Sequence, residues 1–323
     1  MSRESDSTGA THIGTEGGGN EVLPSYTSHP DYGSYLMPAG FPVSGFISGL
    51  AYNAQPSDLF VATYPKNGTT WTQHIVYLIL NDGRPISAEQ RLDEEFPHLE
   101  EVGKEFVEKR AAVAAGFRLI KTHLPYDMTP QNPKAKYICV IRNPKDCVVS
   151  FFHHTRGFVK HYNFSDGSFE TYFGLFVEGK VDFGSYFDCV RSWLNHKDDE
   201  NVLLLTYESL RNDPREGVLK IAEFLDAGVY PDRLLANDEE ILNKVLEHSS
   251  LKNMQKDPRR WCSERPKEHT PFIRKGSMGG WDELLSPKQI KMLDSRMRDI
   301  CSEEELKMLG DKYYPGFIPD RPR

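Results

Sequence analysis

Short apolar runs in the middle of the chain have the length and composition of buried β-strands. They are Leu59–Thr63, Phe117–Thr122, Lys136–Arg142 and Asn201–Tyr207, each rich in Val, Ile, Leu or Phe. Runs that are apolar on both faces are typical of the inner strands of a parallel sheet, which helices cover on both sides. We therefore predict a central parallel sheet built on these segments.

Between these runs the apolar positions recur every three or four residues, which predicts amphipathic helices. The predicted helices are Trp71–Leu80, Pro144–Thr155, Phe183–Asn195, Asp213–Phe224 and Glu239–Glu247. Strands that alternate with helices form βαβ units. The predicted fold class is α/β, as a single domain with a central parallel β-sheet flanked by helices. Ligands of such sheets bind beyond the carboxyl ends of the strands, so residues that follow the strands are the first candidates for a site.

Composition separates a short tail from one large domain. Residues 1–22 are rich in Ser, Thr and Gly and predict a disordered N-terminal tail, and residues 23–323 are expected to form one domain. The N-terminus has no apolar core of a signal peptide, and no apolar run reaches the roughly 20 residues of a membrane helix. The five cysteines lack metal-ligand spacing, as expected for reduced thiols. We expect a cytoplasmic protein that does not bind membranes.

The chain is acidic, with a formal net charge of −8 and a pI near 5.8. A general nucleic-acid-binding protein is more often basic, so no nucleic-acid partner is expected. An anionic ligand would therefore have to meet a local group of cations rather than an overall positive field.

The segment after the first predicted strand has the properties of an anion-binding loop. In Tyr64–Thr70 a proline ends the strand, Gly68 permits a tight turn, and two threonines can cap the next helix. Backbone N–H groups at a helix start, two hydroxyls and Lys66 suit a phosphate or sulfate. The same residues also fit an ordinary strand–turn–helix corner with a surface lysine. The GxxxxGK[ST] pattern of kinases and ATPases is absent, because here the lysine precedes the glycine.

The order Tyr-Pro-Lys-Asn-Gly-Thr-Thr-Trp at Tyr64–Trp71 resembles the 5′-phosphosulfate loop of the cytosolic sulfotransferases, a P-loop-like element. Asn67 stands where that family usually has serine. The resemblance implies 3′-phosphoadenosine 5′-phosphosulfate (PAPS) as the sulfuryl donor and adenosine 3′,5′-bisphosphate (PAP) as its product. The donor contacts that it implies in this loop are Lys66, Asn67, Gly68, Thr69, Thr70 and Trp71.

A second candidate, His123, follows the second predicted strand in the sequence Lys-Thr-His-Leu-Pro that begins at Lys121. A histidine at a strand end is well placed to exchange a proton near neutral pH. Taken alone, such a histidine is more often a structural one bonded to a backbone carbonyl. The segment resembles the family segment that carries the catalytic base. The resemblance implies that His123 deprotonates the acceptor and that Lys121 lies near the donor's bridging oxygen.

Two further segments resemble the family's 3′-phosphate site. Ile141–Ser150 joins a strand to a helix, and the resemblance implies that Arg142 and Ser150 bind the 3′-phosphate. By itself, Arg142 fits a structural pair with an aspartate equally well. The basic, glycine-rich Phe272–Trp281 is similar to the family's Arg-Lys-Gly-x-x-Gly-Asp-Trp segment, although by itself it would be an ordinary surface loop. The residues that it implies at the 3′-phosphate are Arg274, Lys275 and Gly276.

Two weaker matches complete the implied donor site. Tyr207 aligns with a family tyrosine that contacts adenine, and Ser249–Met254 aligns with the segment beside the nucleotide. Its implied contacts are Ser249, Leu251 and Met254. Because Leu251 replaces the usual aromatic residue, adenine would stack on Trp71 and meet an aliphatic side chain opposite.

The resemblance extends from Tyr35 to Trp281 and implies in-line transfer of the sulfuryl group to an acceptor oxygen or nitrogen. It assigns the base to His123, and charge stabilisation on the leaving phosphate oxygen to Lys66 and Lys121. It also implies that Ser150 holds Lys66 aside until the acceptor binds. With these lysines no metal is required.

The acceptor pocket is the part of the implied site that the sequence defines least. Aromatic residues and histidines near the positions that shape it in the family are Phe41, Phe96, His98, Phe151, His154, Phe158 and His161, and any of them can equally be a core residue. Aromatic walls suit a small phenolic or catecholic acceptor. Position 158 is phenylalanine, so an amine acceptor would need a carboxylate at another position to bind it. An alcohol or steroid acceptor, dehydration of an alcohol through its sulfate, and a non-catalytic nucleotide-binding protein stay open.

Oligomeric state is predicted from the segment that follows the glycine-rich loop. Family dimers use Lys-x-x-x-Thr-Val-x-x-x-Glu, and the aligned residues here are Asp282, Ser286, Pro287 and Lys291. The charges at both ends are reversed, and proline removes a backbone donor. We predict a monomer or a non-standard homodimer.

Overall fold

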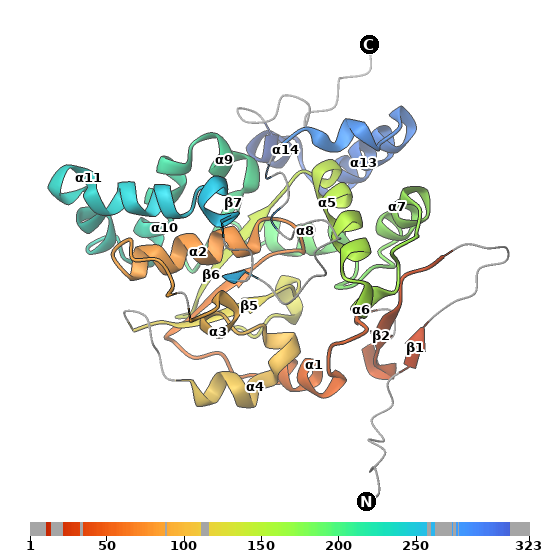
Figure 1. The fold of residues 1–323 in the computed structure, drawn as a ribbon, viewed down its shortest axis with the longest axis horizontal. Helices are drawn as coiled ribbons and strands as arrows, with labels where there is room; N and C mark the ends of the chain where they lie inside the picture. The colour runs from red at the N-terminus through yellow and green to blue at the C-terminus, as the bar shows by residue number, and fades with distance from the viewer. Residues whose placement is uncertain are drawn as a thin grey trace, which may run out of the picture.

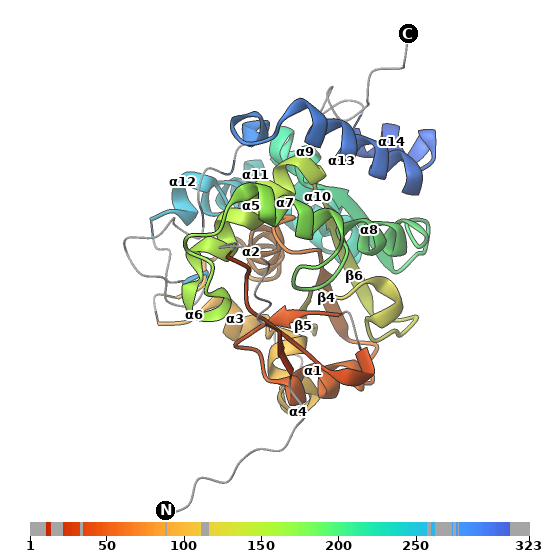
Figure 2. The same ribbon diagram turned by 90° about the vertical axis from the view of Figure 1, so that its right-hand side faces the viewer.

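The structure is a computed structural model that describes residues 11–13, 22–32, 35–87, 89–110, 116–256, 260–261, 273, 276 and 278–310. Figures 1 and 2 show its helices arranged around a central sheet. The elements are β1 Thr11–Ile13, β2 Tyr26–Ser28, η1 Pro30–Tyr32, β3 Met37–Pro38, α1 Val43–Leu50, β4 Asp58–Ala62, α2 Thr69–Leu80, α3 Leu92–Glu95, α4 Leu99–Lys109, β5 Arg118–Thr122, η2 Tyr126–Met128, β6 Lys136–Ile141, α5 Pro144–Gly157, α6 Val159–Tyr162, α7 Phe169–Val177, α8 Tyr186–Leu194, β7 Val202–Thr206, α9 Tyr207–Asn212, α10 Pro214–Asp226, α11 Tyr230–His248, α12 Leu251–Met254, η4 Gly280–Glu283, α13 Pro287–Ile300 and α14 Glu303–Gly310.

The central sheet has the order β5-β4-β6-β7, and all of its strands are parallel. Each strand lies within one residue of the run predicted for it. Side chains of successive residues point to opposite faces, so Leu59 and Val61 pack in one apolar cluster while Phe60 and Ala62 pack in another. The predicted α/β fold with a single domain is confirmed.

Helices cover both faces of the sheet (Figure 1). The cluster around Leu59 includes residues of α2, α10 and α11, and the cluster around Phe60 includes residues of α5, α7 and α8. All five residues of β4 are buried, which explains why this strand reads as a continuous apolar run rather than an alternating one.

The predicted helices exist, but their ends differ in informative ways. We expected Thr69 and Thr70 to cap α2, and this is wrong. The N-cap is Gly68, in a left-handed conformation with no side-chain cap, and the Thr69 hydroxyl instead bonds that of Thr63. Helix α8 begins at Tyr186, later than predicted, because the Ser185 side chain accepts from the backbone N–H of Asp188 and acts as its cap.

A small antiparallel sheet of order β1-β2-β3 lies apart from the central one. Its strand β1, Thr11–Ile13, pairs with β2 and falls inside the segment 1–22 that was predicted to be a disordered tail. The rest of that division into tail and domain stays a prediction. Within the described residues, no helix is both long and apolar enough to cross a membrane.

Strand order also locates a crevice. From β4 the chain continues to β5 on one side, and from β6 it continues to β7 on the other. The loops that follow the adjacent strands β4 and β6 therefore diverge, and such a switch point is where ligands bind in open α/β sheets. Lys66 lies in the loop after β4, and Arg142 directly follows β6.

Candidate active site

The loop between β4 and α2 has a tightly constrained backbone. Lys66 has φ 69° and Gly68 has φ 100°, both in the region that L-residues avoid. A Cβ added at Gly68 would lie 2.8 Å from Cδ2 of Tyr207, so the loop is also packed closely against α9. Without a side-chain cap, the N–H groups at the start of α2 stay available to an anion.

Arg142 connects the two loops of the crevice. Its guanidinium donates to the Lys66 carbonyl at 3.0 Å and lies over the Tyr207 ring, 4.4 Å from the centroid. The next residue, Asn143, donates its backbone N–H to Glu208 at 3.0 Å, and burial raises the pKa of Glu208 to about 7. The Arg142 guanidinium is therefore held at the carboxyl ends of β4 and β6.

The far end of the crevice is built from segments distant in sequence. The Trp71 indole donates to the Ser249 carbonyl at 2.9 Å, and its ring meets Tyr207 edge-on at 5.6 Å. The Tyr207 hydroxyl donates to the Gly276 carbonyl at 3.2 Å, and a Cβ on Gly276 would lie 2.8 Å from Leu251. The residues implied for the adenine end, among them Trp71 and Leu251, thus lie together, and binding of adenine between them stays a prediction.

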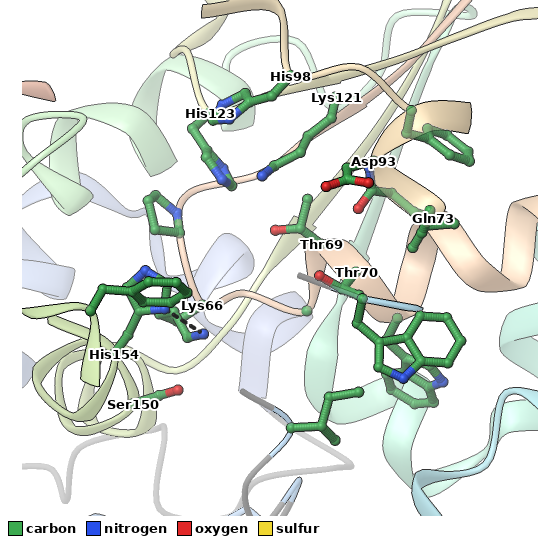
Figure 3. Close-up of a pocket in the computed structure, with 18 of the residues that line it drawn as sticks. Lys66, Thr69, Thr70, Gln73, Asp93, His98, Lys121, His123, Ser150 and His154 are labelled. Carbon is green, nitrogen blue, oxygen red and sulfur yellow. Dashed lines mark hydrogen bonds between the residues drawn. The ribbon is translucent and has the colours of Figure 1, made fainter. Parts of the chain in front are cut away.

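One cavity of about 740 Å³ joins the crevice to an aromatic compartment. Figure 3 shows part of its wall. Of the predicted site residues that the structure describes, all except Asn67 and Phe151 line this cavity; Asn67 is 1% exposed and off the lining. Phe151 is a core residue that meets Tyr64 edge-on. Arg274 and Lys275 lie outside the described residues.

His123 is held in a defined tautomer. Its Nδ1 lies 2.7 Å from the Thr63 carbonyl oxygen, which can only accept a hydrogen bond. Nδ1 therefore carries the proton in the neutral ring, and Nε2 keeps its lone pair. The residue is 7% exposed and lines the cavity. The two functions considered for it, structural bonding to a carbonyl and proton acceptance, are compatible because they use different nitrogens.

The surroundings of His123 keep it neutral. Burial holds its pKa well below the ordinary value, and the positive charge of Lys121 acts in the same direction. Lys121 and His123 are two residues apart at the end of β5, so their side chains extend from the same wall (Figure 3). A lysine and a neutral imidazole therefore face one space.

Glu100 is a supporting residue that the sequence analysis did not find. It is fully buried, and its Oε1 accepts the backbone N–H of His123 at 2.6 Å and lies 3.5 Å from Nε2 of His98. Its negative charge raises the pKa of His123, against the lowering effect of burial. Nothing in the local pattern separates Glu100 from Glu101, whose side chain is 51% exposed.

Lys66 lies on the opposite wall from His123 (Figure 3). Its Nζ lies 3.3 Å from Nδ1 of His154. Ser150 and His154 are four residues apart on α5, and both line the cavity. The structure thus brings His154, predicted as an acceptor residue, to Lys66, while the catalytic role of Lys66 and the hold of Ser150 on it stay predictions.

The remaining predicted acceptor residues also line the cavity, namely Phe41, Phe96, His98, Phe158 and His161. The structure adds Tyr162, Asp182 and Phe183 to this compartment. The Phe183 ring contacts the rings of His123, at 4.8 Å, and Phe41, at 6.1 Å. These additions come from α6 and from the loop before α8, where no motif marked them.

The arrangement defines a class of site. An uncapped helix start and three cations, Lys66, Lys121 and Arg142, suit an anionic donor in an otherwise acidic protein. A neutral histidine beside them suits an acceptor that must lose a proton. The site is that of a group-transfer enzyme with an anionic donor.

Comparison with known proteins identifies the family. A family model described as "Sulfotransferase domain" matches residues 56–310. Sulfotransferase 1B1 of Mus musculus is 32% identical and covers 80% of this chain and 88% of its own. The amine sulfotransferase of Oryctolagus cuniculus is 33% identical, covering 80% and 86%. A crystal structure of mouse sulfotransferase SULT7A1 complexed with PAP has a TM-score of 0.64 and 27% identity, covering 83% of this chain and 93% of its own. The chain belongs to the sulfotransferase family, and it is a sulfotransferase.

Proposed function

We propose that this enzyme transfers the sulfuryl group of PAPS in line to the hydroxyl of a small phenolic or catecholic acceptor, with His123 as the general base. The observation that carries the proposal is the tautomer of His123, because a bond from Nδ1 to the Thr63 carbonyl leaves Nε2 as a proton acceptor in the cavity. The donor is supported by the likeness to mouse SULT7A1, which is complexed with PAP.

The described residues fit such a donor. Lys66 and the N–H groups at the start of α2 would hold its 5′-phosphosulfate, and Arg142 with Ser150 would hold the 3′-phosphate. The slot between Trp71 and Leu251 would receive adenine. A side chain at position 68 would push against the Tyr207 ring, 2.8 Å from its Cβ, and so would disturb the wall of the donor site; the φ of 100° also favours glycine there.

The chemistry assigned to the protein is proton transfer and charge stabilisation. His123 Nε2 takes the acceptor's proton as the new O–S bond forms. As the bond between sulfur and the phosphate oxygen breaks, Lys66 and Lys121 stabilise the negative charge left on that oxygen. These cations are in place before the reaction, and burial keeps His123 neutral and ready to accept.

The acceptor is small because one cavity of about 740 Å³ has to hold it together with the donor. Its compartment has aromatic walls, including Phe41, Phe158 and Phe183, which suit a flat ring. We also propose a cytoplasmic location, for which the support is that Cys139, Cys147, Cys189 and Cys301 are buried free thiols.

The test is sulfation of a panel of phenols, alcohols and amines with radiolabelled donor, by the wild type and by His123→Ala. We expect phenol sulfation that falls roughly 10²- to 10⁴-fold in the variant, the range of general-base catalysis. PAP affinity by calorimetry should change less than twofold. His196→Ala is the matched control, because this histidine stacks on Tyr126 outside the cavity lining. Equal turnover by His123→Ala and wild type would refute the assigned base.

A further inference from the structure

The acceptor compartment contains a buried carboxylate that the mechanism does not use. Asp182 lines the cavity and is 1% exposed. Its Oδ2 accepts a hydrogen bond from the Tyr162 hydroxyl at 2.6 Å. Its Oδ1 is also buried, and no donor among the described residues bonds to it. A buried carboxylate oxygen without a donor is costly, so this atom stands out as half of an unfinished interaction.

The pKa of Asp182 reflects its burial with only one of its two carboxylate oxygens bonded to another side chain. Burial raises its pKa to about 7, while the Tyr162 hydrogen bond, a hydrogen bond from its own backbone N–H and the positive charge of Lys66 lower it. The tyrosines packed nearby, Tyr26 and Tyr35, have pKa values raised well above the ordinary one and stay neutral. A ligand that supplies a cationic N–H donor would complete the coordination of Oδ1 and favour the charged form.

Asp182 lies beside the reacting centre rather than in a separate pocket. The next residue, Phe183, contacts the His123 ring at 4.8 Å, and consecutive Cα atoms are about 3.8 Å apart. Its partner Tyr162 meets the His154 ring at 6.1 Å, and His154 lies 3.3 Å from the Lys66 ammonium. Asp182 is therefore placed between the wall that carries the base and the wall that carries the lysine.

Three histidines of the compartment supply no competing charge. Burial lowers the pKa of His98, His123 and His161, so these rings are neutral near pH 7. Position 158 is phenylalanine and offers no carboxylate to an amine. Glu101 also lines the cavity beside His98, but its side chain is 51% exposed, whereas Asp182 is buried on the lining.

We propose that Asp182 is the acceptor-recognition residue of this enzyme and binds a protonated amine carried by the acceptor, with the reacting hydroxyl at His123. The inference rests on the proposed function and narrows its acceptor class to small phenols that also carry a basic amine. The alternatives are that Asp182 only anchors Tyr162, or that it acts through Lys66.

The experiment compares an acceptor pair that differs in one group, 4-(2-aminoethyl)phenol and 4-ethylphenol. We measure kcat/KM for both, and the affinity of both for the PAP-bound enzyme by calorimetry, in wild type and in Asp182→Asn. Asparagine keeps the shape and still accepts from Tyr162, but it carries no charge. The preference for the amine over the neutral phenol should fall at least tenfold, mainly through KM and binding of the amine.

Asp93→Asn is the matched control. Asp93 also lines the cavity, but its side chain is 46% exposed and pairs with Arg91. It should leave the amine preference within threefold of wild type. If Asp93→Asn rather than Asp182→Asn removes the preference, the amine is recognised at the rim and the proposal is wrong.

The other outcomes are equally decisive. An unchanged preference in Asp182→Asn overturns the proposal, and an equal fall in kcat for both acceptors assigns Asp182 a role through Lys66 or Tyr162 instead. If wild type sulfates neither phenol, the proposed phenolic acceptor fails, while the binding measurements still decide whether Asp182 selects the amine. Should Asp182→Asn fail to bind PAP, Tyr162→Phe replaces it, since loss of the hydroxyl leaves Asp182 less ionised and should also weaken amine binding.

Discussion

Gly68→Ala tests whether the phosphosulfate loop is shaped by its backbone and by its contact with α9. At φ 100° an L-residue costs about 1–2 kcal/mol relative to a relaxed backbone. The new Cβ would also lie 2.8 Å from the Tyr207 ring. Tyr207 has little room to move, because it is stacked under Arg142 and hydrogen-bonded to Gly276. Overpacking of this kind costs about 1–3 kcal/mol.

The two terms add to roughly 2–5 kcal/mol, shared between the free energy of unfolding and the free energy of PAP binding. Denaturant unfolding measures the first, and calorimetry with PAP measures the second, where a loss of about 1.4 kcal/mol is tenfold in affinity. If the loop yields and the fold does not, PAP affinity falls by roughly 30-fold or more.

Gly116→Ala is the control that separates the cost of a positive φ from the cost of the contact with Tyr207. Gly116 has φ +92° and a Cβ there would meet nothing within 4 Å. That variant should lose only about 1–2 kcal/mol of stability and bind PAP like wild type. The reasoning would be refuted if Gly68→Ala matched Gly116→Ala in stability and also retained wild-type PAP affinity.

Two further predictions concern ionisation and assembly. Burial and the charge of Lys121 lower the pKa of His123, so the base is lost only as pH falls through that lowered value. The acid limb of the kcat/KM profile should therefore lie below about pH 6.5. Lys121→Met removes a positive charge that lowers the pKa of His123, so the acid limb of the profile should move to higher pH. An acid limb at the same pH in this variant would show that Lys121 does not lower the pKa of the base. Light scattering should find a monomer, since Pro287 occupies the first turn of α13. If the wild type is a dimer and Lys291→Glu dissociates it, the predicted monomer is wrong.

The donor half of the site is largely encoded in local sequence. The runs that became β4 and β6 are apolar throughout because they are buried on both faces, and the residues that follow them carry the chemistry. The motif order then placed Lys66, His123 and Arg142 at strand ends, and the parallel sheet brings those ends to one edge.

Helix ends were less well determined. The cap of α2 was misassigned because a left-handed glycine and a capping threonine leave similar patterns, and only the backbone geometry separates them. Helix α11 is interrupted at Ala236–Glu239, where Asn237 and Asp238, both weak helix formers, adopt left-handed backbone angles.

Sequence by itself therefore determined the strands and which residues follow the strand ends at the switch point, because these depend on local pattern. Tertiary structure alone decided that Glu100 supports His123, that His154 meets Lys66, and that Asp182 lines the acceptor compartment with one carboxylate oxygen that no described donor meets. Each depends on burial and on contacts between segments far apart in the chain. A carboxylate's environment, and not its neighbours in sequence, sets whether it is a solvated surface group or a buried one that needs a partner.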